Sequence, residues 1–129
     1  SLREEMEFAS AYIFLLKMRF ENNLQFDIQI AKSFEDYRLP PMAVQVLIEN
    51  AVKHNEISDR KPLTIHITTD SEGYLSVSND IQPKRTAASG TGIGLVNLAK
   101  RYRLLFKQDI QITEDKEFSV CIPLIDEVQ

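Results

Sequence analysis

Hydrophobic residues recur along the chain with two different periods, and the periods predict which segments are helices and which are strands. Three segments repeat apolar side chains every third or fourth residue, as amphipathic helices do. They are residues 2–21, 40–55 and 94–106. Five segments alternate apolar and polar side chains, as strands with one buried face do. They are residues 24–30, 64–69, 74–78, 109–113 and 117–124.

The order of these elements predicts the fold class. Helix, strand, helix, hairpin, loop, helix and hairpin follow one another, and every strand has a single apolar face. We therefore expect an α+β fold, a two-layer sandwich of one mixed sheet with helices on one face. Pro40 and Pro41 are expected to open the second helix. The buried face of the third helix is expected to consist of Leu95, Leu98, Tyr102 and Leu105.

Composition narrows the classes of protein and partner. The chain has 129 residues, 43% hydrophobic and 26% charged, which fits one globular domain. A net charge of -4 gives no general footprint for nucleic acid, so we expect no direct nucleic-acid partner. The single Cys121 cannot form an internal disulfide and favours the cytoplasm. No apolar run approaches the roughly 18 residues of a membrane span. The chain begins without Met, so a membrane segment could lie outside it.

The most informative segment for chemistry lies on the second predicted helix. Asn50, Lys53 and His54 fall on neighbouring turns of one side, at the edge of the apolar stripe. An amide oxygen suits Mg²⁺, and a lysine and a histidine beside it could contact phosphate oxygens. The alternative is a solvated helix flank, with Glu49 and Lys53 as an i,i+4 pair and His54 near the negative end of the helix dipole.

A glycine-rich segment runs straight into the third helix. Gly90, Gly92 and Gly94 alternate with other residues from Ser89 to Leu95. Closely spaced glycines let backbone N–H groups approach a phosphate, and a helix N-terminus adds favourable partial charge. The segment is neither a Walker motif nor a dinucleotide fingerprint, because the residues and the glycine spacing differ. The alternative is a flexible turn into a helix.

Together the two segments resemble one known arrangement. Residues 47–54, Leu-Ile-Glu-Asn-Ala-Val-Lys-His, resemble the asparagine box of the GHKL ATPases. Residues 90–95, Gly-Thr-Gly-Ile-Gly-Leu, resemble their second glycine box. The flanking residues 40–51 and 94–102, and the helix that opens the chain, are similar to LytS-like sensor histidine kinases. The resemblance covers nearly the whole chain, with both boxes in the correct order and separation.

The resemblance implies the Bergerat ATP-binding fold and a set of site residues. Asn50 would hold Mg²⁺, Lys53 and His54 would lie near the phosphates of ATP, and residues 80–93 would cover the nucleotide. The other implied nucleotide-binding residues are Asn79, Asp80, Gly90, Thr91, Gly92, Gly94 and Leu95. Residues 1–21 would lead from a dimerisation region outside this chain, and residues 22–129 would form the ATPase domain.

The chain departs from the family pattern at the first glycine box. Where the family has Asp-Asn-Gly-x-Gly, residues 79–83 are Asn-Asp-Ile-Gln-Pro. Asn79 would replace the aspartate that accepts the adenine amino hydrogens, and an amide can still accept and donate. A neutral bond in place of a charged one predicts affinity lower by about tenfold. Asp80 is the alternative contact, but it would face the opposite way on a strand.

Two further departures concern the reaction. Val46 stands where hydrolysing relatives carry a glutamate base, so we expect no water activation; transfer to a histidine needs no strong base. His54 belongs to the asparagine box and His66 should face outward from a strand, so the phosphoacceptor histidine would lie outside this chain. The expected partners are the dimerisation region of a homodimeric, membrane-anchored parent kinase and a LytTR-type response regulator. The alternative is a degenerate scaffold that senses nucleotide or binds none.

Overall fold

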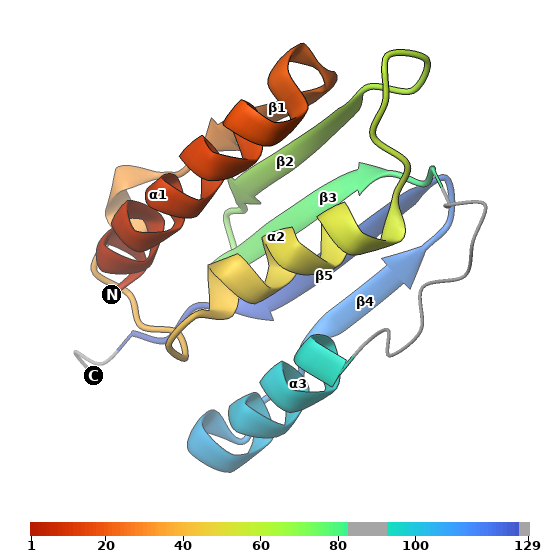
Figure 1. Ribbon diagram of the computed structural model, residues 1–129. Coiled ribbons are helices and arrows are strands. Elements are labelled where there is room, and N and C mark those ends of the chain that lie inside the picture. Colours follow the sequence, from red (N-terminus) through yellow and green to blue (C-terminus); the bar gives the residue numbers. More distant parts are fainter. Residues whose placement is uncertain (83–92, 127–129) are drawn as a thin grey trace.

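The computed structural model describes residues 1–82 and 93–126, and within them it contains three α-helices and five strands (Figure 1). The helices are α1 (Leu2–Phe20), α2 (Ala43–His54) and α3 (Ile93–Phe106). The strands are β1 (Leu24–Gln29), β2 (Leu63–Thr69), β3 (Tyr74–Asp80), β4 (Gln111–Glu114) and β5 (Glu117–Pro123). Short 3₁₀ turns at Glu21–Asn23 and Lys32–Phe34 flank β1.

The strands form one mixed sheet, as the alternating pattern predicts. The order is β1-β2-β3-β5-β4; β1 and β2 are parallel, and the other neighbours are antiparallel. In Figure 1 all three helices lie in front of the same face of this sheet, so the two-layer α+β prediction is confirmed. None of the helices in the described residues is both long and apolar enough to span a bilayer.

The core lies between the helices and the covered face of the sheet. Ile65, Ile67 and Leu75 are fully buried there, and Ile48 of α2 and Leu98 of α3 belong to the same buried cluster. The opposite face carries partly exposed polar residues. Across it, His66 pairs in register with Asp27, and the His66 Nδ1–Asp27 Oδ2 distance is 3.0 Å. The outward position predicted for His66 is therefore confirmed.

The second helix starts later than the sequence predicts. Pro40 and Pro41 do not open it, because Met42 adopts a left-handed backbone (φ 69°) that turns the chain before Ala43. Glu5 of α1 accepts a hydrogen bond from the Met42 N–H through Oε1, at 3.0 Å. A carboxylate at this position also suits the positive end of a helix dipole. The first turn of α2 is thus set by α1 as well as by its own sequence.

The last turn of α3 corrects another prediction. Leu95, Leu98 and Tyr102 are buried as expected, but Leu105 is 60% exposed. Helical spacing gives the direction of a side chain but not what lies opposite, and the C-terminal end of α3 projects beyond β4 (Figure 1). Phe106 packs on Tyr102 instead, with ring centroids 5.8 Å apart. Burial raises the pKa of Tyr102, whose hydroxyl donates to the Pro123 carbonyl at 2.9 Å.

The edge strand β1 shows the same limit. The alternation of residues 24–30 predicts one buried face, yet only Leu24 is fully covered, and Ile28 is 43% exposed. Because β1 has a neighbour on one side only, its end lies at the margin of the helical layer. Helix α1 nevertheless belongs to the same core, through Ala9, Ile13 and Leu16. The division of the chain at residue 21 stays a prediction.

Candidate functional site

Helix α2 carries the central side chains of the site. Val44, Leu47, Ile48 and Ala51 are buried on the side that faces the sheet and the other helices. An α-helix turns by about 100° per residue, so Asn50 and His54, which is four residues later, lie at the edge of this apolar stripe. Both residues are half-buried, so part of each side chain stays accessible.

A cavity of about 340 Å³ opens beside this edge of α2. Segments distant in sequence converge on it: α2 and the residue after it, the residue after β3, the first turn of α3, β4 and β5. Its lining residues are Asn50, His54, Asn55, Ile81, Leu95, Glu114 and Phe118. The cavity therefore has a helical wall from α2 and a strand wall from Ile81, Glu114 and Phe118.

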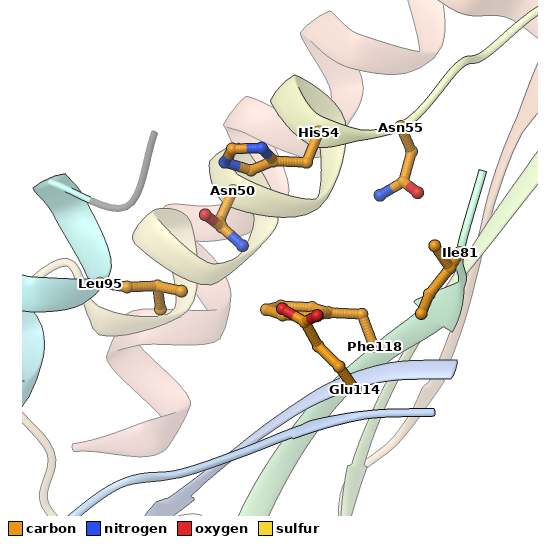
Figure 2. Close-up of a pocket in the computed structure, with 7 residues that line it drawn as sticks. All are labelled: Asn50, His54, Asn55, Ile81, Leu95, Glu114 and Phe118. Atoms are coloured by element: carbon orange, nitrogen blue, oxygen red, sulfur yellow. The ribbon is translucent and has the colours of Figure 1, made fainter. Parts of the chain in front are cut away.

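The two walls offer different chemistry (Figure 2). Asn50 and His54 lie side by side on successive turns of α2, and Leu95 lies beyond Asn50. The Phe118 ring faces them, with the Glu114 carboxylate beside it. Asn55 and Ile81 lie at the other end. One end is thus polar and adjacent to the first turn of α3, and the other is bounded by Ile81 and Asn55.

Of the residues predicted for the site, Asn50, His54 and Leu95 line the cavity together. Lys53 lies on the exposed side of α2 and is not among the lining residues. Asp80, the last residue of β3, is also exposed. Gly90, Thr91 and Gly92 lie outside the described residues, so their predicted contacts stay predictions.

Asn79 is buried beside the cavity and does not line it. Its side chain is 1% exposed, on the same face of β3 as Leu75 and Val77. The Asn79 Nδ2 donates to the carbonyl of Asp80 at 2.8 Å, and Asn79 is in register with Phe118, which lines the cavity. Asn79 rather than Asp80 faces the helical layer, as strand alternation predicts.

Gly94 has a packing reason that glycine spacing does not reveal. It is the second residue of α3, and a Cβ built on it would lie 3.3 Å from Val46 Cγ1 of α2. That distance is tight for a carbon contact, so the absence of a side chain lets α3 approach α2 closely. Val46, which stands where a general base is expected in hydrolysing relatives, is part of this packing contact.

Among the described residues that line the cavity, sequence reasoning missed three: Asn55, Glu114 and Phe118. Asn55 directly follows His54, the last residue of α2. The Asn55 Nδ2 donates to the Ala51 carbonyl at 2.8 Å, and its Oδ1 accepts from the Gln82 N–H at 2.8 Å. Glu114 and Phe118 carry no motif, and only the sheet order brings them beside Ile81, which belongs to the segment compared above with the first glycine box.

The donor set suits a hard metal ion such as Mg²⁺. In the described residues no three His, Cys, Asp or Glu side chains form a cluster that could hold an ion. A single amide such as Asn50 fits Mg²⁺ bound with phosphate oxygens and water, because Mg²⁺ keeps several waters and takes few protein ligands. The cavity therefore fits a metal that arrives with a phosphate ligand rather than a resident metal centre.

Curated proteins similar to this chain are sensor kinases. The sensor protein LytS of Streptococcus mutans is 36% identical over 89% of this chain, and sensor histidine kinase BtsS of Escherichia coli K12 is 32% identical over 88%. The chain is a homologue of the LytS-type sensor histidine kinases. This homologue spans about a fifth of the length of those relatives (22% and 21%). No protein-family model matches it.

Solved structures agree on the fold of this LytS homologue. The nucleotide-free catalytic domain of histidine kinase ThkA matches 92% of each chain with a TM-score of 0.58 and 20% identity. The mycobacterial sensor histidine kinase MprB matches 93% of this chain and 94% of its own, with a TM-score of 0.51 and 13% identity. The fold is that of a histidine kinase catalytic domain.

Proposed function

We propose that the cavity binds Mg-ATP and that the chain is the catalytic domain of a sensor histidine kinase, which passes the γ-phosphoryl group to a histidine outside this chain. One observation carries the proposal. Asn50 and His54 of the asparagine-box segment line a single cavity with Leu95, in the first turn of α3. Leu95 lies more than 40 positions away from Asn50 and His54 in sequence, and the resemblance independently assigns both segments to one nucleotide site.

The polar end of the cavity would take the phosphates. Asn50 would contribute an amide oxygen to Mg²⁺, and His54 would donate to a phosphate oxygen. The N-terminal turn of α3 would add free backbone N–H groups and partial positive charge. Lys53, exposed on the next turn, has a long side chain that can swing to an outer phosphate oxygen. Bound Mg²⁺ would neutralise charge on the phosphates, and these residues would position them.

The other end would take the nucleobase. Ile81 and, next along the strand wall, Phe118 give apolar surface for a ring, and Asn79 is in register with Phe118 on the neighbouring strand. The Asn79 amide can offer an acceptor to an adenine amino group and a donor to a ring nitrogen. Its Nδ2 already donates to the Asp80 carbonyl, so acceptance by Oδ1 is the contact that we assign to adenine.

Val46 is the reason that we expect transfer of the phosphoryl group to a histidine rather than to water. It is packed against Gly94 and has no group that can accept a proton from water. Glu49 lies next to Asn50 in sequence but about 100° around the helix, and it accepts from Gln45 Nε2 at 3.4 Å. An imidazole is itself a nucleophile at neutral pH and needs no such base.

The wider context is also part of the proposal. The acceptor histidine and the dimerisation helices would belong to the remaining part of a homodimeric parent kinase, anchored in the plasma membrane with this domain in the cytoplasm. A response regulator, which we expect to be of the LytTR type, would then take the phosphoryl group on an aspartate. The similarity to LytS and BtsS supports a two-component parent of this kind.

Calorimetric titration with a non-hydrolysable ATP analogue, with and without Mg²⁺, tests the site. We expect Mg²⁺ to strengthen binding of the analogue, and we expect Asn50→Ala to remove most of this gain. Loss of a supporting contact at a metal site typically lowers metal affinity by about 10- to 100-fold. Gln45→Ala is the matched control, because it removes an amide from the same helix without touching the cavity lining.

Two results would contradict the proposal. Absence of binding at millimolar analogue would favour the alternative, a scaffold domain that acts through protein contacts. An equal magnesium effect in Asn50→Ala and the unaltered chain would move the metal away from α2.

A further inference from the structure

The chain that leaves β3 is fastened to the end of α2 through one residue, Gln82. The Gln82 N–H donates to Asn55 Oδ1 at 2.8 Å, and the Gln82 carbonyl accepts from the Glu56 N–H. The Gln82 side chain adds two more bonds, because Nε2 donates to the Glu56 carbonyl at 2.9 Å and to the Lys61 carbonyl at 3.2 Å. Four hydrogen bonds thus converge on a residue outside any helix or strand.

One hydrogen-bond partner of Gln82, Asn55, and one chain neighbour, Ile81, are part of the cavity wall. Asn55 lines the cavity, and its Nδ2 is tied back to the Ala51 carbonyl in the last turn of α2. Ile81, the neighbour of Gln82, lines the cavity from the strand side. The Ile81 N–H donates to the Lys116 carbonyl in the turn between β4 and β5, at 3.4 Å. The Gln82 bonds therefore join the helical wall to the strand wall at one end of the cavity.

The residues on either side of Gln82 are restricted in conformation and in the hydrogen bonds that they can donate. Ile81 is β-branched and limited in its side-chain rotamers, and Pro83 has a fixed φ and no N–H. Gln82 is the residue between them that can donate from both backbone and side chain. The side-chain amide is half of the connection, and it is the half that substitution can remove while the backbone stays intact.

We infer that Gln82 is a positioning residue, which holds Ile81 and Asn55 at the separation that the nucleobase requires. The inference rests on the proposed nucleotide function. Asn50 and His54 occupy the opposite end of the cavity, so the Gln82 connection acts on the base end and not on the metal end. Its loss therefore weakens nucleotide binding without changing how much Mg²⁺ strengthens it. No other role for Gln82 in the reaction is needed.

Gln82→Met is the sharpest test, because methionine keeps the length of the side chain and removes both donors. Gln82→Ala is the second variant, in case methionine packs in a new way. Gln25→Ala is the control: Gln25 is an exposed glutamine on β1 with one local bond, to the Asn22 carbonyl, and β2 separates β1 from β3. Affinities for the non-hydrolysable ATP analogue and for ADP are measured by calorimetry with and without Mg²⁺, and thermal unfolding is measured separately.

We expect Gln82→Met and Gln82→Ala to bind both nucleotides about tenfold more weakly, the factor that corresponds to one or two lost hydrogen bonds. The ratio of affinities with and without Mg²⁺ should stay that of the unaltered chain, and Gln25→Ala should bind as the unaltered chain does. This pattern separates Gln82 from Asn50, where the same ratio collapses.

Three results overturn the inference. Unchanged affinity in folded Gln82 variants, whatever their melting temperature, would reduce Gln82 to a structural residue. A change in the magnesium ratio would place its effect at the phosphate end. If the unaltered chain binds neither nucleotide, the proposed function itself fails and takes this inference with it, and that outcome is visible before any variant is made.

Discussion

The two walls of the cavity differ in how the sequence encodes them. The helical wall comes from one stretch of α2, where Asn50 and His54 are four residues apart and one turn of helix brings them together. The strand wall comes from Ile81, Glu114 and Phe118, on segments that meet only because β5 pairs between β3 and β4. A local period fixes the first wall, whereas the second exists only once the whole sheet has formed.

The two walls should therefore respond differently to substitution. On α2 a side chain can be exchanged while the backbone keeps its own hydrogen bonds, so ligand contacts and stability are separable there. On the strand side, Asn79 and Gln82 bond to the backbone that shapes the cavity. A change in that region should therefore alter stability and binding together.

Asn79→Asp should give the largest combined change in stability and nucleotide affinity. The buried amide donates to the Asp80 carbonyl at 2.8 Å, and an ionised carboxylate can only accept. We expect the unfolding free energy to fall by about 1–3 kcal/mol, the usual cost of a buried polar group left without its partner. If adenine binds at this position, a charged acceptor should at the same time raise nucleotide affinity by up to about tenfold.

Denaturant unfolding and calorimetry measure the two effects of Asn79→Asp. Asp80→Asn is the matched control, because it makes the reverse exchange at the neighbouring, exposed residue and should change stability little. Unchanged stability in Asn79→Asp would mean that the bond to the Asp80 carbonyl is dispensable. The strand wall would then be as tolerant as the helical one.

Glu114→Gln should have a smaller effect, confined to binding. Glu114 is an exposed carboxylate on the rim of a cavity that we assign to a polyanionic ligand. At surface dielectric values its repulsion of a phosphate group is worth about 1 kcal/mol or less. We expect the magnesium-free analogue to bind about threefold more tightly to Glu114→Gln, with a smaller gain when Mg²⁺ neutralises the phosphates.

The salt dependence of binding checks this electrostatic origin. The gain should shrink as added salt screens the charges, since Glu114 is open to solvent. Glu117→Gln, on an exposed residue of β5 outside the cavity lining, should leave the affinity unchanged. A loss of affinity in Glu114→Gln would indicate instead that the carboxylate accepts a hydrogen bond from the ligand, which makes it part of the binding surface.

The sequence predicts the fold and the helical wall well, for the same physical reason. Both depend on local periods of hydrophobicity, which give the helices and strands of the described residues in the correct order, although α2 begins at Ala43 rather than at Pro40. Leu105 and Ile28 were misplaced because burial also requires something opposite, and the ends of α3 and β1 lie at the margin of the layers. Glu114 and Phe118 were not predictable, because no spacing within one element links them to Ile81 or to the residues of α2.

Gly94 and Val46 lie between these two cases. The glycine spacing points to phosphate contacts, yet the position of Gly94 has a packing requirement, its close approach to Val46. A single sequence does not show which residues of two different elements contact each other, even when each residue has been noted on its own. The same holds for Asn55 and Gln82, each unremarkable alone and bonded to one another in the fold.

The smallest effect belongs to a region outside both walls, the open face of the sheet. The hydrogen bond with His66, and then that with Gln29, holds the pKa of Asp27 below its ordinary value. A carboxyl group with a lowered pKa stabilises the fold above its unfolded-state pKa, and this contribution is lost as the pH falls through the folded-state pKa. His66→Ala should therefore raise the pKa of Asp27, and its stability should approach that of the unaltered chain in acid.

An NMR titration of the Asp27 carboxyl carbon measures this shift, and Gln29→Ala should give a smaller rise because its bond to Asp27 is the weaker cause. Nucleotide affinity should be unchanged in His66→Ala, since His66 projects from the face of the sheet opposite to Asn79 and the cavity. A clear loss of affinity would contradict the separation of the two faces. It would mean that the strand wall depends on the cross-strand pairs behind it as well as on Gln82.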